Sequence, residues 1–178
     1  MGCVRTRVIL LRAVNVGGAT LPMADLRQIM AELGAENVRT YIASGNAVCD
    51  LDGDPDAFDR ALESAIEKRF GYFRESISRT PEELVAALAA HPFEVIEPKC
   101  SYVTFLTATP TAAAIEKARG YETGDDVWEI IGRDQHTRFA GGGGTPQMKT
   151  VAIAKALGVP GTARNLNTVR ALIALARA

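Results

Sequence analysis

The sequence of 178 residues contains few cysteine, histidine and aromatic residues. It has 3 Cys, 2 His and 1 Trp, and aromatic residues make up 6% of the chain. The cysteines are widely spaced and include no Cys-x-x-Cys pair, which predicts neither a disulfide framework nor a cysteine zinc site. Neither His91 nor His136 stands at metal-ligand spacing from another ligand residue. We therefore expect no metal site.

The chain also lacks a long apolar run and an excess of charge of either sign. Its first apolar run, 8–11, follows Arg5 and Arg7 and is far too short for a signal-peptide core or a membrane span. The 20 Lys and Arg residues are balanced by 21 Asp and Glu residues. This balance gives no general attraction to nucleic acid or to an anionic membrane. We expect a cytoplasmic protein without a membrane partner, and the charge balance disfavours a nucleic-acid partner.

The composition that is present, 47% hydrophobic and 23% charged, is that of an ordinary globular protein. Apolar periodicity and turn residues predict strands at 4–14, 38–42, 47–51 and 74–78, and helices at 22–33 and 55–70. The order strand, helix, strand, strand, helix, strand is that of the ferredoxin-like βαββαβ unit. Residues 1–79 are thus expected to form an α+β unit with both helices on one face of an antiparallel sheet.

Residues 80–178 repeat most of this order. Thr80 and Glu83 have capping-box spacing around Pro81, which predicts a helix at 81–90. Further strands are expected at 101–107, 127–131 and 136–140, and helices at 111–119 and 145–157. The α+β fold class is therefore a ferredoxin-like βαββαβ unit at 1–79, followed by a related βαββα half at 80–178 with a C-terminal helix.

Four sequence runs carry a family resemblance: LLRAVNVGG at 10–18, PMADL at 22–26, TYIASGN at 40–46 and RNLNTV at 164–169. With these runs the chain resembles the bacterial family of uncharacterised proteins catalogued as domain of unknown function 1697. The resemblance extends over nearly the whole chain. It implies a ferredoxin-like α+β fold in small cytoplasmic proteins, and it implies no established activity or cofactor.

The chain departs from that family at several positions. Ala13 stands where the family usually has glycine, Ala47 where it has valine, and Leu166 where it has tryptophan. The run at 141–144 consists of glycine alone, whereas the family's glycine-rich region includes an aromatic residue. A ligand that stacks on such a ring in the family would not find the same site here.

The N-terminal half contains the main candidate for a binding site. Gly17 and Gly18 follow the first strand, where glycine lets backbone N–H groups converge on an anion, and Arg12 can add a charge-assisted contact. The hairpin turn supplies further donors. The candidate ligand-binding residues in this half are Arg12, Asn15, Gly17, Gly18, Ser44, Gly45 and Asn46. The alternative is that glycine, serine and asparagine only shape the turns.

A second group of candidate ligand-binding residues, Arg164, Asn165 and Asn167, precedes the last helix, and a closing role over the same site is the hypothesis for Arg164 and Asn167. Because asparagine is a natural N-cap, a structural role is the open alternative for these residues. The run 143–150 nearly matches the phosphate loop Gly-x-x-x-x-Gly-Lys-Thr, but Met148 occupies a required glycine position. A weaker anion site at this predicted helix start, beside Lys149, remains an alternative to a plain connector.

No residue pattern assigns a catalytic group or a cofactor. A triad of Ser44, His136 and an aspartate would be an arbitrary assembly, since geometry defines a triad. The sequence predicts binding of a small anionic or phosphorylated ligand through arginine, asparagine and glycine loops. The alternatives are a non-enzymatic interaction or homo-oligomerisation module and RNA binding, although the chain lacks the aromatic run of an RNA-recognition sheet.

Overall fold

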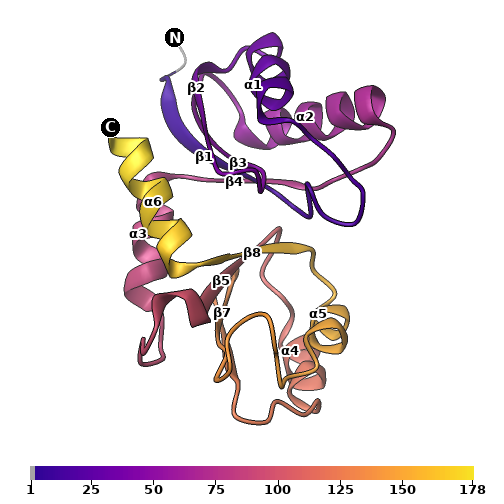
Figure 1. Ribbon diagram of the computed structural model, residues 1–178, viewed down its shortest axis with the longest axis vertical. Helices are drawn as coiled ribbons and strands as arrows, with labels where there is room; N and C mark the ends of the chain where they lie inside the picture. The colour runs from indigo at the N-terminus through magenta and orange to yellow at the C-terminus, as the bar shows by residue number, and fades with distance from the viewer. Residues whose placement is uncertain (1–2) are drawn as a thin grey trace. The chain divides into compact units, whose positions relative to one another are not determined.

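A computed structural model describes residues 3–178 (Figure 1). The chain divides into two compact units, one formed by residues up to Val85 together with Ala171–Ala178, the other by Ala86–Arg170. Two helices, α3 (Pro81–Ala90) and α6 (Leu166–Arg177), contribute residues to both units. Within the described residues, no helix has the length and apolarity needed to cross a membrane.

The first unit is built on a four-stranded antiparallel sheet in the order β2-β3-β1-β4. Its strands are β1 (Arg5–Leu11), β2 (Glu36–Tyr41), β3 (Asn46–Leu51) and β4 (Ser76–Arg79), and its helices are α1 (Met23–Glu32) and α2 (Pro55–Phe70). Leu26 of α1 and Leu62 of α2 share one core with Ile9 and Ala47 of the sheet. Both helices therefore cover the same sheet face, and the predicted βαββαβ unit is confirmed.

Local sequence signals set the ends of α2. Asp54 accepts a hydrogen bond from the Asp56 amide at 3.1 Å, and Pro55 occupies the first turn. Gly71 ends the helix in the left-handed conformation, with φ of 78°. The helix buries Phe58, Leu62 and Ile66. These are the positions predicted from the apolar residues that recur at every fourth position.

Two buried carboxylates of α2 hold the edge strand β4. Asp59 accepts hydrogen bonds from the hydroxyls of Ser76 at 2.7 Å and Ser78 at 2.8 Å, and Glu63 accepts from the Ser76 amide at 2.9 Å. Burial is the largest influence on the pKa of both carboxyls and raises it. These bonds satisfy donors of an edge strand that would otherwise remain open for pairing.

The second unit repeats the arrangement, with sheet order β6-β7-β5-β8. It contains β5 (Ser101–Leu106), β6 (Val127–Ile131), β7 (Asp134–Arg138), β8 (Gly161–Asn165), α4 (Ala112–Arg119), α5 (Thr150–Leu157) and the short 3-10 helix η1 (Pro98–Cys100). Trp128 packs with Ala118, Met148, Ile153 and Leu157 in its core. The fold is therefore α+β with two related antiparallel halves.

Three sequence expectations need correction. The second half contains a strand, β8, that the sequence analysis missed, so it is a complete βαββαβ-like half. Helix α5 begins at Thr150 rather than at Thr145, because the preceding residues form a turn. The first strand ends at Leu11, and residues 12–18 form a loop. The capping box is confirmed, since the Glu83 amide donates to the Thr80 hydroxyl at 3.0 Å.

Candidate functional site

Three loops of the first unit meet at one end of its sheet, at 12–18, 42–46 and 73–75; we call them the loop cluster. Asn15 joins two of them. Its Nδ2 donates to the backbone oxygens of Leu21 at 3.0 Å and Ala43 at 2.5 Å, and its Oδ1 accepts from the Leu21 amide at 2.8 Å. The Asn15 carboxamide therefore holds the loops in place.

The hairpin turn is fixed in a similar way. Gly45 is buried, and a Cβ atom added to it would lie 2.5 Å from Cγ2 of Val14 and 2.9 Å from Cβ of Leu11. Asn46 is fully buried, and its Nδ2 donates to the Tyr41 oxygen at 3.2 Å and to the Ser44 hydroxyl at 2.9 Å. Within the turn these residues serve packing and backbone satisfaction, and a ligand contact from them stays a prediction.

Two arginines border the loop cluster. Arg12 pairs with Glu75 at 3.2 Å, and its side chain keeps 47% of its surface exposed. Arg74 donates from Nε to the Ala13 oxygen at 3.0 Å and lies 4.9 Å above the ring of Tyr72. Arg74 was not among the predicted site residues, because the contact that brings it to this loop spans 61 residues.

Ala13 has a backbone conformation that alanine rarely adopts, with φ of 51°. This explains the glycine that the family resemblance implies there. Ala13→Gly removes the energetic cost of placing a side chain in the left-handed conformation. It should raise the free energy of unfolding of the first unit by about 1 kcal/mol. Urea unfolding measures the change.

The control for this prediction is Ala31→Gly, at an exposed position of helix α1. Glycine there should lower the free energy of unfolding, by at most about 1 kcal/mol in this last turn of the helix, because its helix propensity is lower than that of alanine. If both variants lose stability equally, the left-handed conformation of Ala13 does not determine its effect.

Gly17 and Gly18 form the tip of a turn that is closed by a hydrogen bond from the Ala19 amide to the Val16 oxygen at 3.1 Å. Both glycines are exposed, with φ of 58° and 85°, and no atom lies within 4 Å of the space a Cβ would take. Within residues 3–178, neither glycine amide donates to another group. The tip thus offers two open backbone donors to solvent.

Apolar side chains are exposed on each loop of the cluster. Val16 is 56% exposed, Ile42 54% and Phe73 46%. Ile42 also has φ of 48°, which is costly for a β-branched residue. The loop cluster therefore combines arginine, open backbone donors and apolar surface.

The other predicted site residues, Arg164, Asn165 and Asn167, belong to the second unit. Arg164 is buried on β8, and its Nη1 donates to the Thr162 hydroxyl at 2.5 Å and the Ala163 oxygen at 2.9 Å. Burial lowers the pKa of Arg164 to about 10. Asn165 accepts from the Thr168 amide at 2.9 Å and so caps α6, on which Asn167 is exposed. Ligand binding by Arg164, Asn165 and Asn167 stays a prediction.

The glycine-rich run before α5 is occupied by a carboxylate of the protein itself. Asp126, 1% exposed, accepts from the amides of Ala140 at 2.8 Å, Gln147 at 2.6 Å and Met148 at 2.9 Å. An anion held by the loop before this helix, as in a phosphate loop, would need the amides of Gln147 and Met148. The resemblance to a phosphate loop therefore has a structural explanation, which is a turn closed by Asp126.

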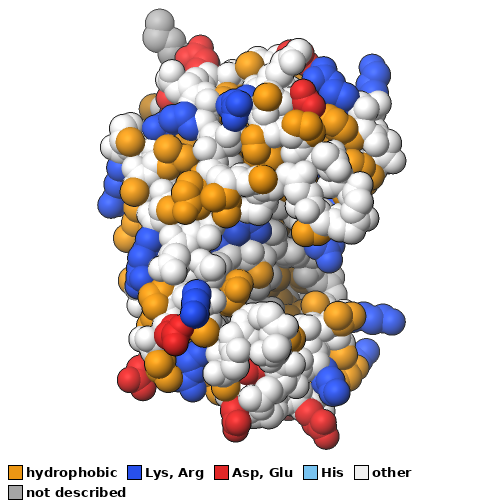
Figure 2. All heavy atoms as spheres, viewed as in Figure 1, with side chains coloured by type: hydrophobic (Ala, Val, Ile, Leu, Met, Phe, Trp, Pro, Cys, Tyr) orange, Lys and Arg blue, Asp and Glu red, His pale blue; other side chains and the backbone are white. Residues whose placement is uncertain are grey.

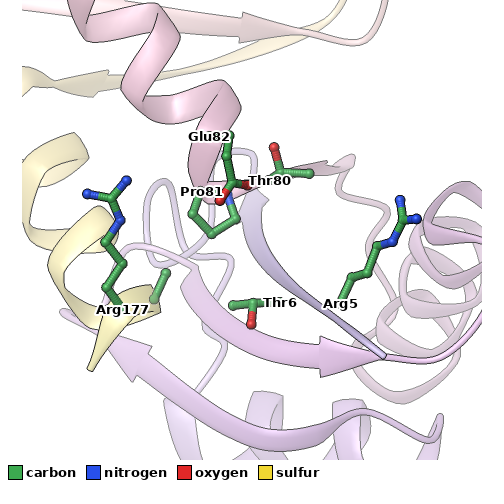
Figure 3. Close-up of a pocket in the computed structure, with 7 residues that line it drawn as sticks. Arg5, Thr6, Thr80, Pro81, Glu82 and Arg177 are labelled. Carbon is green, nitrogen blue, oxygen red and sulfur yellow. The ribbon is translucent and has the colours of Figure 1, made fainter. Parts of the chain in front are cut away.

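A separate cleft of about 360 Å³ lies beside the start of α3, lined by Arg5, Thr6, Thr80, Pro81, Glu82, Ala176 and Arg177 (Figure 3). Figure 3 shows the guanidinium groups of Arg5 and Arg177 at opposite ends, turned away from each other. The Thr6 hydroxyl donates to Asp50 at 2.8 Å, and the Thr80 hydroxyl accepts from the helix. Its polar groups do not converge on one point, so the loop cluster remains the stronger candidate.

The described residues contain no group of three or more His, Cys, Asp or Glu side chains arranged to hold a metal. On the face shown in Figure 2, basic and acidic side chains are scattered over each unit rather than gathered in one patch.

Fold and site together define a class: an α+β protein of two ferredoxin-like halves with a loop cluster at the end of the first sheet. The family model described as "Protein of unknown function (DUF1697)" matches residues 4–135. The chain belongs to this family. No curated protein matches it.

Among solved structures, the chain is similar to the conserved bacterial protein SP0830 from Streptococcus pneumoniae. The two share 20% sequence identity with a TM-score of 0.73, over 99% of this chain and 100% of the other. At this identity the likeness concerns the fold.

Proposed function

We propose that the loop cluster binds a small ligand that carries an anionic group beside an apolar part. The open amides of Gly17 and Gly18 are the observation that carries the proposal. Successive backbone N–H groups in a turn can form a concavity that accepts an anion. Arg12 supplies the charge, and Val16 and Phe73 supply apolar surface.

The Arg12 ion pair with Glu75 does not oppose this role. Exposed pairs of this kind contribute about 0 to 1 kcal/mol, so an incoming anion can share or replace Glu75 at small cost. A bidentate contact from a guanidinium to phosphate or carboxylate is stronger.

Backbone strain supports the same location. Of the four non-glycine residues with positive φ in the described chain, Ala13, Asn15 and Ile42 lie in the loop cluster. Such conformations persist where the surrounding contacts enforce them, and they gather at binding sites. Here the Asn15 bonds and the buried Gly45 provide that enforcement.

Inorganic phosphate is the probe for binding of the anionic group. We expect Arg12→Gln to weaken phosphate binding by about tenfold, since one lost charge-assisted bond is worth about 1.5 kcal/mol or more. Phosphate-dependent chemical shifts of backbone amides measure the affinity.

Arg5→Gln is the matched control, because Arg5 is exposed and lies at the opposite end of β1. It should leave phosphate binding unchanged. Equal losses in both variants would indicate a general charge effect, or binding at the cleft that Arg5 lines. Self-association that Phe73→Ser abolishes, without any phosphate-dependent shift, would favour the interaction module instead.

A further inference from the structure

The chain's 2 histidines meet in the second unit. Nδ1 of His91 and Nδ1 of His136 lie 3.2 Å apart, and the ring centroids are 5.3 Å apart. His136 stands on β7 and is fully buried, whereas His91 follows α3 and is half-buried. The rings of His91 and Phe93 pack edge to face, with 5.6 Å between their centroids.

This geometry specifies how the protons are placed. Two Nδ1 atoms at hydrogen-bond distance require one ring to carry a proton on Nδ1 and the other to present a lone pair. Both Nε2 atoms are buried, and neither has a hydrogen-bond partner in the described chain. One ring therefore has the less common Nδ1–H tautomer, and a doubly protonated pair would bring two N–H groups face to face.

Charged groups surround the pair on several elements. Asp134 and Arg138 flank His136 on β7, two residues away on either side, and Glu129 is its register neighbour on β6. Glu129 is engaged by Arg119 at 2.6 Å.

Two further charged residues complete these surroundings. On β5, His136 pairs with Val103, which in turn pairs with Arg164 of β8. Glu94 belongs to the connector that follows His91 and is exposed. The register therefore places both acidic and basic residues on the face of the sheet that carries His136.

Burial is the main influence that opposes protonation of the pair. Burial, then the positive charge of Arg138, lowers the pKa of His91. Burial, then His91, lowers the pKa of His136 to about 4. Both rings are neutral near pH 7, which is the state that the hydrogen bond between them requires.

The segment held by this bond is the connector at 91–97, between α3 and η1. Most of it is exposed, including Val95 at 37% and Ile96 at 73%, while His91 and Phe93 are half-buried. Its attachment through His91 therefore depends on an imidazole, a group that takes up a proton when the pH falls.

We propose that His91 and His136 form an acid-sensitive latch, closed at neutral pH, that releases the connector at 91–97 when the pair takes up protons. The open form has imidazoles with ordinary pKa values of about 6.5. Because the closed form has lowered pKa values, its stability is complete above pH 6.5 and is lost as the pH falls toward 4. Release exposes more of Phe93 and of the buried His136.

Nitrogen-15 spectra of the wild-type imidazoles test the closed state. At pH 7 we expect one ring protonated at Nδ1 and the other at Nε2. Two rings both protonated at Nε2 would overturn the latch, because neither Nδ1 could then donate.

Hydrogen exchange tests the opening. Corrected for intrinsic rates, opening of the amides at 91–97 should increase about tenfold per pH unit below 6.5 for each proton taken up. His91→Gln should reduce this slope. Protection that is unchanged between pH 7 and pH 5, an equal slope in His91→Gln, or Zn²⁺ coordination by both Nδ1 atoms would each overturn the proposal.

Discussion

Asp126→Ala should lower the free energy of unfolding of the second unit by about 3 to 5 kcal/mol. The carboxylate is buried and accepts three backbone amides, from Ala140, Gln147 and Met148. Its removal deletes charge-assisted bonds and leaves donors without partners, at about 1 to 3 kcal/mol each, and part of that loss is recovered by water. Trp128, the chain's single tryptophan, lies in the same core, so its fluorescence during urea unfolding reports on this unit.

Asp126→Asn is the matched variant. The amide oxygen of the asparagine can still accept from the amides of Gln147 and Met148. Its NH2 group then faces the Ala140 amide, so two donors meet and that hydrogen bond is lost. We expect about half of the loss seen in Asp126→Ala. A loss below about 1 kcal/mol in Asp126→Ala would show that the glycine-rich turn does not depend on this carboxylate.

Gly45→Ala should destabilise the first unit by about 3 kcal/mol. The added Cβ would lie 2.5 Å from Cγ2 of Val14 and 2.9 Å from Cβ of Leu11, at a residue with φ of 78°. The left-handed conformation costs about 1 kcal/mol, and overpacking against a buried strand costs about 1 to 3 kcal/mol more. Exchange of the β1 and β3 amides measures the loss in this unit.

Gly71→Ala separates the two causes. Gly71 also has φ of 78°, and nothing lies within 4 Å of its missing Cβ. This variant should cost about 1 kcal/mol, which is the conformational part alone. Equal costs at Gly45 and Gly71 would mean that the hairpin turn does not pack tightly on the loop at 12–18.

The helices were predictable from the sequence because each buries one stripe of side chains. Leu26, Ile29 and Met30 in α1, like the apolar residues of α2, recur at helical spacing and are buried. Strand β8 was not predictable in this way, because its run Gly161–Asn165 contains glycine, arginine and asparagine. It forms a strand by pairing with β5, a partner that is far away in the sequence.

The start of α5 shows the same limit. Thr145 and Pro146 carry a good local signal for a helix start, yet the amides of Gln147 and Met148 bind Asp126 from a turn more than 20 residues earlier. A long-range contact thus overrides the local signal. No pattern within the 141–150 run points to Asp126.

The exposure of some candidate site residues was predictable from the sequence, and the contacts of the others were not. The sequence indicated Arg12, Gly17 and Gly18, which the structure leaves exposed. The sequence could not show that the Asn15 carboxamide bonds to Leu21 and Ala43, because these hydrogen bonds form only when the folded chain brings the loops together. The contact between His91 and His136 was not predictable for the same reason, since the two residues are 45 positions apart in the sequence.

A single phosphate titration, followed at backbone amides, tests the central claim most directly. Gly17 and Gly18 have open amides, whereas the amides of Gln147 and Met148 are already bound to Asp126. We predict that phosphate shifts the Gly17 and Gly18 signals in a saturable way and leaves those of Gln147 and Met148 in place. Saturable shifts at Gln147 and Met148 with none at Gly17 and Gly18, or no saturable shift at any of these amides, would contradict anion binding by the loop cluster.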